Sequence, residues 1–271
     1  MNIHFTKKHL LAAATMLSLV VKAALLVTLF HGSAKAETAP DANRLVQDAD
    51  RYRTTDENLQ VETQVTVFNR DGSPDKERRY TVLLQSGHRS LVLMRSPAEQ
   101  GQKVLMLADD FWLLMPGSQR ALRITPTQKL LGDASTGDIA TLRWSEDYQA
   151  TLVGEEPCDP AAATSSKCWH LNLAAGRKGA SYQRIELWVG KSRHEPVRAD
   201  LYVQSDKLAK QAVFVLDKPA DKPGALVSEM RLTDQLASHK VTAVGYLARS
   251  PRSVPEAWLN PMFLARNPSL D

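Results

Sequence analysis

Residues 59–67 read Leu-Gln-Val-Glu-Thr-Gln-Val-Thr-Val, and this stretch decides the fold class. Apolar residues such as Val61, Val65 and Val67 alternate with polar ones, which is the period of a β-strand with one buried face. The run ends in Asn-Arg-Asp-Gly at 69–72, residue types that favour a tight turn. The sequence therefore predicts a strand that enters a hairpin.

Short strand patterns continue along most of the chain. They are expected at residues 80–85, 89–95, 103–108, 111–115, 121–124, 148–153, 168–174, 182–189, 197–203, 211–216, 226–233 and 240–247. A helical pattern stands before them, with Asp41 as the N-cap of a short helix that extends to Tyr52. Because long crossover helices are lacking, we predict a mainly β domain with an antiparallel sheet.

Several predicted strands are apolar on both alternations, for example 91–94 and 111–115. A large sheet of this kind must curl to close its core or shelter an internal cavity. The segment Thr127–Leu142 has few strand formers and is expected to cross one side of the sheet as helical turns and loop. The proline-rich residues 250–271 are expected to dock as an irregular cap.

The first 36 residues read as a secretory signal peptide. A positively charged start precedes an apolar run over residues 10–30, and small residues precede a predicted cleavage after Ala36. The alternative is an uncleaved membrane anchor, which Lys22 disfavours because a charge near mid-bilayer costs about 2.5 kcal/mol or more. We predict a soluble exported protein with one domain, residues 37–271.

Charge argues against a nucleic-acid partner. The whole chain carries a formal net charge of +4, but four lysines and no acidic residue lie in the leader. The remainder is therefore neutral, whereas binding to phosphate backbones requires clustered Lys and Arg. We predict no nucleic-acid binding.

The two cysteines, Cys158 and Cys168, flank a short polar loop. In an oxidising compartment such a pair forms a structural disulfide. A redox-active pair is the alternative, and it is expected at the closer spacing Cys-x-x-Cys.

The sequence shows no pattern of catalytic or metal-binding residues. The histidines after the leader lie far apart and in no metal-binding spacing: His88, His170, His194 and His239. Nucleophile-elbow, phosphate-loop and dinucleotide-binding motifs are absent from the sequence. We predict no catalytic residue, no metal and no cofactor, and an enzyme is the least supported class.

Six segments carry further information. They are Asp-Asp-Phe-Trp-Leu-Leu-Met-Pro-Gly at 109–117, Arg-Ile-Thr-Pro at 123–126, Leu-Leu-Gly-Asp-Ala-Ser-Thr-Gly-Asp-Ile at 130–139, and the strands at 168–173, 182–189 and 196–202. With these segments the chain resembles, over roughly residues 51–247, the LolA-like family of periplasmic outer-membrane lipoprotein-sorting proteins. The resemblance implies a half-open, unclosed β-barrel with short helices as a lid over its concave face. It also implies a carrier of lipid or acylated lipoprotein, loaded by an inner-membrane transporter and unloaded at an outer-membrane acceptor.

Physical chemistry agrees with this implication. Exposing a hydrocarbon chain of about 16 carbons to water costs on the order of 12 kcal/mol of free energy. A carrier needs an apolar cavity, and we expect a mobile lid over Thr127–Leu142. The residues expected to face the cavity are Val65, Val67, Leu91, Leu93, Met106, Leu113, Leu171, Ile185, Leu187, Leu201, Val203, Phe214 and Met230. A shift of one residue in register would turn any of them to the other face.

Two alternatives stay open beside the carrier. A similar half-barrel also serves as an envelope sensor, which would bind a membrane signalling partner through a surface patch. An outer-membrane barrel would need girdles of aromatic residues, whereas aromatic residues make up 6% of the chain.

Overall fold

The structure is a computed structural model that describes residues 39–162, 165–236, 240–264 and 266. The predicted signal peptide with its cleavage site after Ala36, and His239, lie outside the described residues. The account below concerns the compact unit that begins at Pro40.

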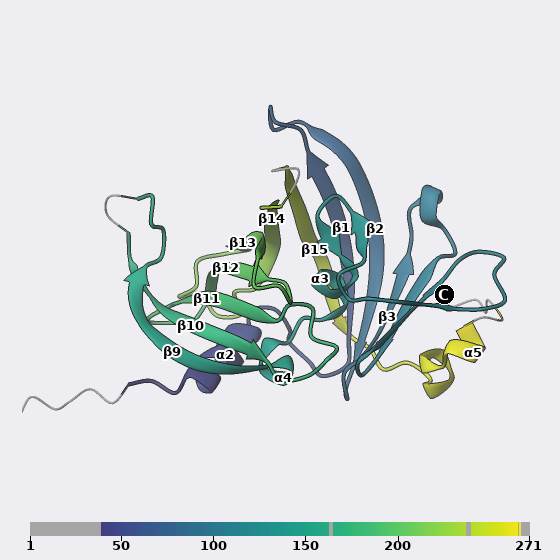
Figure 1. Cartoon of the computed structure of the whole chain (residues 1–271), viewed down its shortest axis with the longest axis horizontal. Coiled ribbons are helices and arrows are strands. Elements are labelled where there is room, and N and C mark those ends of the chain that lie inside the picture. The colour runs from purple at the N-terminus through teal and green to yellow at the C-terminus, as the bar shows by residue number, and fades with distance from the viewer. Residues whose placement is uncertain (1–38, 163–164, 237–239, 265, 267–271) are drawn as a thin grey trace, which may run out of the picture. The chain divides into compact units, whose positions relative to one another are not determined.

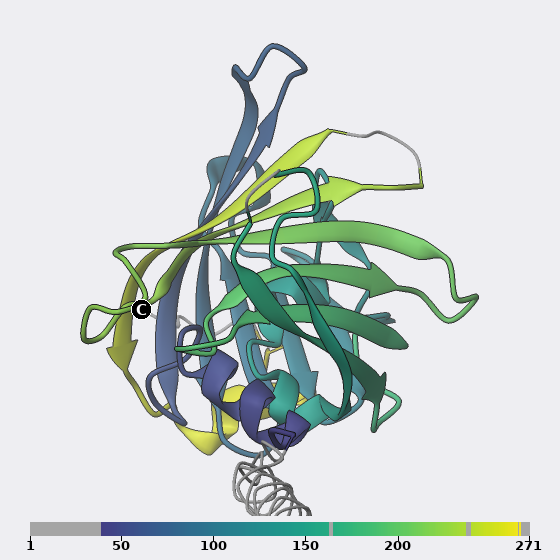
Figure 2. The same cartoon turned by 90° about the vertical axis from the view of Figure 1, so that its left-hand side faces the viewer.

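One antiparallel sheet of thirteen strands dominates this unit, in the order β6-β5-β4-β3-β2-β1-β15-β14-β13-β12-β11-β10-β9. The strands are β1 Leu59–Phe68, β2 Pro74–Gln85, β3 Arg89–Met94, β4 Lys103–Leu107, β5 Asp110–Leu114, β6 Leu122–Ile124, β9 Tyr148–Pro157, β10 Lys167–Ala175, β11 Arg184–Gly190, β12 Pro196–Tyr202, β13 Leu208–Leu216, β14 Val227–Asp234 and β15 Val241–Pro251. The edge strands β6 and β9 do not pair with each other, so the sheet curves without closing (Figures 1 and 2). The predicted mainly β, unclosed half-barrel is confirmed.

Strand β1 joins the two halves of the sheet, because it pairs with both β2 and β15. Its buried residues alternate with half-buried ones along its whole length, as the sequence period predicts. We call the concave side, which carries Val61, Val65, Val92, Ile185 and Phe214, the inner face.

Helix α2 (Ala42–Asp50) begins at Asp41, whose carboxylate accepts a hydrogen bond from the Asn43 backbone N–H at 3.0 Å. It packs against α4 and β9, and Figure 2 shows α2 and α4 next to each other. The Asn43 side-chain oxygen accepts from the Ala150 backbone N–H at 3.0 Å. This contact satisfies one polar group on the free edge of β9, where an unpaired group would invite association.

Residues 125–147, which we call the strap, cross the inner face. They contain β7 (Lys129–Leu131), β8 (Ala134–Ser135), α3 (Thr136–Ala140) and α4 (Trp144–Asp147). In the described part of the chain β7 and β8 pair only with each other and form a separate small sheet. Helix α3 contacts β2 and β3, and β7 contacts β1, so the strap covers the concave side (Figure 1).

The domain has a main core and a second core on opposite faces of the sheet. The main core fills the space between the inner face, α2 and the strap. The second core lies on the outer face of β2–β5, where Leu83 and Leu105 pack under Leu259 and Leu264. These two residues belong to the C-terminal elements η3 (Glu256–Leu259) and α5 (Pro261–Leu264).

This second core corrects the predicted register of β3. Leu91 and Leu93 were expected on the inner face, but both belong to the outer-face core, while Val92 and Met94 belong to the main core. The C-terminal segment covers the outer face here, so both faces of β3 are buried and both are apolar. The apolar pattern alone therefore could not select the inward-facing set.

The predicted disulfide between Cys158 and Cys168 is confirmed. It lies in a small outer-face cluster with Trp188. The indole of Trp188 stacks on the His170 ring, with 4.3 Å between centroids, and the Arg198 guanidinium lies 3.3 Å from the Trp188 ring centroid. The disulfide therefore anchors the outer side of β9–β12, away from the strap.

Candidate functional site

The inner face brings together most of the residues predicted to line a cavity. Those in the main core are Val65, Met106, Leu171, Ile185, Leu187, Leu201, Phe214 and Met230. Leu113 packs against this core, Val67 is buried, and Val203 lies half-buried just beyond β12. Leu91 and Leu93 are on the outer face. A role of the inner-face residues in ligand binding stays a prediction.

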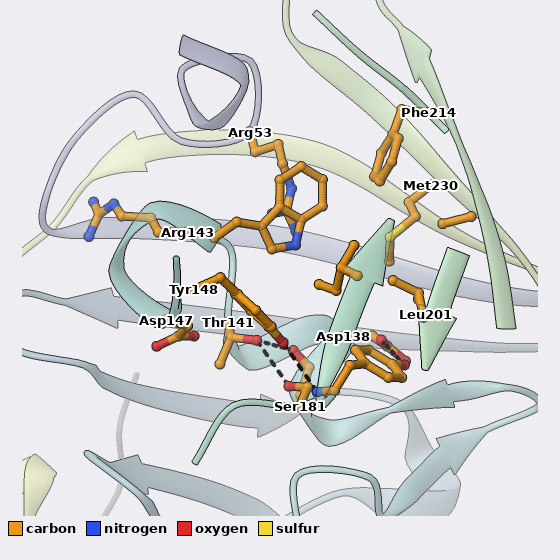
Figure 3. Close-up of a pocket in the computed structure, with 15 residues that line it drawn as sticks. Arg53, Asp138, Thr141, Arg143, Asp147, Tyr148, Ser181, Leu201, Phe214 and Met230 are labelled. Carbon is orange, nitrogen blue, oxygen red and sulfur yellow. Dashed lines mark hydrogen bonds between the residues drawn. The ribbon is translucent and has the colours of Figure 1, made fainter. Parts of the chain in front are cut away.

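The cavity under the strap is far smaller than the sequence led us to expect. Its volume is about 30 Å³, and Ile185 is among its lining residues. The apolar side chains of Leu201, Phe214 and Met230 form one wall (Figure 3). A single water needs roughly 10–15 Å³ of such space. The prediction of a roomy hollow is thus wrong for this conformation, because the strap fills the concavity with its own side chains.

A buried carboxylate fastens the strap helix α3 to the sheet. The Asp138 side chain is 3% exposed, and it accepts from Lys210 Nζ on β13 at 2.7 Å and from the Tyr182 hydroxyl at 2.6 Å. It also accepts from the Ser135 backbone N–H at 2.8 Å, which forms a capping box at the start of α3. We call this cluster of Asp138, Ser135, Tyr182 and Lys210 the latch.

Electrostatics in the latch favour the charged carboxylate. Burial by itself raises the pKa of Asp138, but the charge of Lys210 and the hydrogen bonds outweigh burial and hold the pKa below its usual value. Burial and the neighbouring Asp138 charge raise the pKa of Tyr182 well above its usual value. Tyr182 therefore stays a neutral donor and Asp138 an ionised acceptor at neutral pH.

A second buried carboxylate, Asp50 at the end of α2, holds the start of α4. It accepts from the backbone N–H groups of Trp144 at 3.0 Å and Ser145 at 2.8 Å. The Trp144 indole lies over the Arg53 guanidinium at 3.7 Å from the ring centroid, and it meets Phe214 edge-on at 5.4 Å between centroids. Burial raises the pKa of Asp50, against the lowering effect of Arg53.

Ion pairs bridge the open side of the sheet near its two edges. Arg177, which follows β10, donates to Asp109 in the β4–β5 turn at 2.9 Å and to Asp147 of α4 at 2.7 Å. His88 Nδ1 in the β2–β3 turn lies 3.3 Å from Asp147. Elements near β6 and β9 are thus tied together although those edges do not pair.

The latch, the Asp50 contact and these bridging ion pairs were not predicted from the sequence. One signal was available, because Ser135 followed three residues later by Asp138 has the spacing of a capping box. Another was Lys210, which shares the inward alternation of Ala212 and Phe214 in β13. Sequence spacing could not show that Asp138 and Lys210 meet across 72 residues.

Among the described residues, no cluster of three or more His, Cys, Asp or Glu side chains is placed to hold a metal ion. The described histidines instead contact carboxylates singly or in pairs: His170 lies between Glu156 and Glu186, and His194 lies 3.0 Å from Asp48. Within the same residues, none of the helices combines the length and apolar character needed to cross a bilayer.

Comparisons with known proteins agree with the fold. A family model described as "Uncharacterized protein" matches residues 86–266, more than half of the chain. No curated protein sequence matches the chain.

Three solved structures are similar over most of the domain. A LolA superfamily protein from Nitrosomonas europaea is 26% identical with a TM-score of 0.71, covering 82% of this chain and 98% of that one. An outer-membrane lipoprotein-sorting domain from Vibrio parahaemolyticus (18% identity, TM-score 0.62, 83% and 98% covered) and a DUF1329 family protein from Desulfovibrio piger (22%, 0.61, 82% and 98%) share the fold. The chain thus belongs to the family of the matching model, and its fold is that of the LolA superfamily.

Proposed function

We propose that this protein is a non-enzymatic periplasmic carrier, which binds the acyl chains of a lipoprotein or another lipid against the inner face and moves them between the two membranes. The observation that carries the proposal is the strap. It covers a continuous apolar wall, yet β7 and β8 do not join the thirteen-stranded sheet. The strap can therefore lift without breaking a strand pair of the large sheet.

Polar contacts hold the strap in addition to its buried apolar side chains. Side chains make its principal bonds to the rest of the domain: Asp138 to Lys210 and Tyr182, Asp50 to the start of α4, and Thr242 Oγ1 to the Asp133 backbone N–H at 3.0 Å. When the strap lifts, the apolar wall loses its cover. An acyl chain that takes the place of the strap restores the burial, at about 0.8 kcal/mol per methylene.

Location and partners belong to the same proposal. The leader with predicted cleavage after Ala36 supports export, and the disulfide between Cys158 and Cys168 fits an oxidising compartment. The sorting function named for the Vibrio parahaemolyticus domain supports lipid or lipoprotein cargo. An inner-membrane transporter would load the carrier, and an outer-membrane acceptor would unload it.

A reversible lock on the strap tests the proposal. Thr141 Oγ1 at the end of α3 lies 3.3 Å from Ser181 Oγ, close enough for a disulfide after Thr141→Cys with Ser181→Cys (Figure 3). The oxidised double variant is expected to lose binding of dodecan-1-ol, and mild reduction is expected to restore it. Each single variant and the parent protein under the same reductant are the controls.

Unchanged binding in a fully locked variant would contradict the proposal. Lipid extracted from protein purified from its own periplasm gives an independent check by mass spectrometry. Phospholipid or acylated peptide at near one equivalent supports a carrier. Failure to transfer that lipid between vesicles, with binding intact, would favour the sensor instead.

A further inference from the structure

Three buried polar atoms without a hydrogen-bond partner among the described residues belong to one region of the main core. They are Arg53 Nη1, Tyr246 Oη and Arg249 Nε. A fourth, Thr63 Oγ1, lies on the strand position directly opposite Tyr246. Buried polar groups are nearly always paired, and each unpaired one costs about 1–3 kcal/mol. A cluster of them therefore calls for an explanation.

These groups meet where the end of α2 contacts β14 and β15. The Val227 backbone N–H donates to the Tyr52 carbonyl at 2.7 Å, and Arg249 donates to the Val227 carbonyl at 2.5 Å. The Arg249 guanidinium lies 5.0 Å from the Tyr246 ring centroid. Burial raises the pKa of Tyr246, while the charges of Arg53 and Arg249 act to lower it.

Each arginine of this cluster lies near one carboxylate, Arg53 near Asp50 and Arg249 near Asp217. Asp50 is the carboxylate nearest to Arg53, and its Oδ1 lies 3.7 Å from Arg53 Nη1, an ion pair too long for a hydrogen bond. The Asp50 oxygens already accept hydrogen bonds from two backbone N–H groups of α4. Lys210 is paired with Asp138 in the latch. Arg53, at 4% exposure, is thus buried, and its Nη1 has no hydrogen-bond partner among the described residues.

Arg53 also faces the apolar wall proposed to bind cargo. It lines the cavity under the strap with Leu201, Phe214 and Met230 (Figure 3), and the Trp144 ring of α4 lies against its guanidinium. Displacement of α4 would remove the indole from the guanidinium and leave a cation at the end of an apolar surface. Arginine binds carboxylate and phosphate through two parallel hydrogen bonds.

We propose that Arg53, supported by Tyr246 and Arg249, binds the anionic head group of an amphiphile whose hydrocarbon chain lies along Leu201, Phe214 and Met230. The inference rests on the proposed carrier function and names its ligand class: lipids with a carboxylate or phosphate at the end of the chain. The bound anion would accept hydrogen bonds from the three unpaired donors.

Two ligands that differ only at the head group test this proposal by isothermal titration calorimetry at pH 7.5. Dodecanoate carries a carboxylate, and dodecan-1-ol carries a hydroxyl on a chain of the same length. We expect dodecanoate to bind at least about tenfold more tightly, as befits hydrogen bonds between charged groups. Arg53→Gln is expected to abolish this difference between the two ligands.

Two further variants complete the test. Arg44→Gln removes an exposed arginine of the same helix and is expected to leave the preference intact. Tyr246→Phe removes a single unpaired hydroxyl and is expected to reduce the preference about threefold or more, which keeps the test decisive if the Arg53 variant does not fold.

The outcomes separate the two proposals. Equal affinity of the parent protein for both ligands overturns the anionic head-group site and leaves the carrier standing, whereas binding of neither ligand overturns the carrier as well. Acetate or inorganic phosphate that binds as tightly as dodecanoate overturns the amphiphile in favour of a site for a free anion. A preference retained in Arg53→Gln overturns the assignment to Arg53.

Discussion

Lys210 Nζ lies 2.7 Å from Asp138 Oδ2, and both side chains are at most 9% exposed. This pair joins the strap helix α3 to strand β13, between segments that are distant in sequence. A buried charge without its partner is far more costly than the pair itself is stabilising. The latch therefore stabilises the closed position of the strap. The strap can open only if Asp138 and Lys210 both gain other partners at the same time.

Removal of one latch partner is expected to destabilise the domain strongly. Asp138→Asn should lower the free energy of unfolding by about 3–5 kcal/mol, because Lys210 stays buried without a countercharge. Urea unfolding followed by circular dichroism measures the change. The control is Lys191→Gln, which breaks an exposed pair with Glu155 and should cost less than about 1 kcal/mol. Similar losses in the two variants would contradict a buried latch.

The latch also predicts a pH dependence with a definite sign. The pKa of Asp138 is below 3.8 in the folded protein and near 3.8 in the unfolded chain. Its contribution is therefore fully present above pH 3.8 and is lost as pH falls through the folded-state pKa. The difference in unfolding free energy between the parent protein and Asp138→Asn should shrink below pH 3.8.

Asp50 does not disturb this comparison, although its contribution has the opposite sign. Its folded-state pKa is raised, so it favours the folded state below pH 3.8 and this contribution is lost as pH rises through the folded pKa. Both proteins contain Asp50, and its effect cancels in the difference. Urea titrations at pH 7, 5, 4 and 3 give the profile, and a difference that grew in acid would contradict the assignment.

Gly132 in the β7–β8 turn is expected to be essential for the close packing of the strap against the sheet. Its φ is +55°, and a Cβ atom there would lie 2.5 Å from both Thr242 Oγ1 and Val67 Cγ2. Gly132→Ala should cost about 1–3 kcal/mol through strain and overpacking. Gly117→Ala is the matched control, since φ is +74° but nothing lies within 4 Å of the added atom. Thermal unfolding should show a clearly larger loss for Gly132→Ala.

Hydrogen exchange should report the opening of the strap. The Thr136 and Gly137 amides donate within the strap, to the carbonyls of Gln128 and Pro126. We expect them to exchange faster than amides of β1 and to lose protection when dodecanoate binds, while β1 stays unchanged. Mass spectrometry of peptides from residues 127–142 measures this. Strong and equal protection in both states would count against a moving strap.

The disulfide is expected to stabilise the domain without affecting the ligand site. Replacement of Cys158 and Cys168 by serine should lower the unfolding free energy by about 3 kcal/mol, because the bond closes a short loop on the outer face. Affinity for dodecan-1-ol should not change. A loss of ligand affinity in the folded variant would show that the outer-face cluster communicates with the inner face.

The strand periods predicted most of the sheet, because burial on one face leaves an alternating pattern such as that of Val61, Val65 and Val67. The same rule misplaced Leu91 and Leu93, where the C-terminal segment buries the second face and removes the polar half of the pattern. The segment that forms the strap was recognised as a covering element.

The polar contacts of the site could not be predicted from the sequence. Asp138 contacts Lys210, and Arg53 contacts Trp144, only because the curved sheet brings distant segments together. The size of the cavity was equally hidden, since it depends on how far the strap side chains fill the concavity. Local pattern indicates which face is apolar, and the tertiary arrangement decides whether that face is occupied.

The leucine layer beneath the C-terminal segment has a mechanical consequence. It packs Leu83, Leu105, Leu259 and Leu264 on the side of the sheet opposite the strap. A carrier that exposes its inner face to bind cargo needs packing elsewhere that this exposure does not affect. If the strap lifts as proposed, strands β2–β5 keep this outer-face packing, so we expect them to stay rigid while the strap moves.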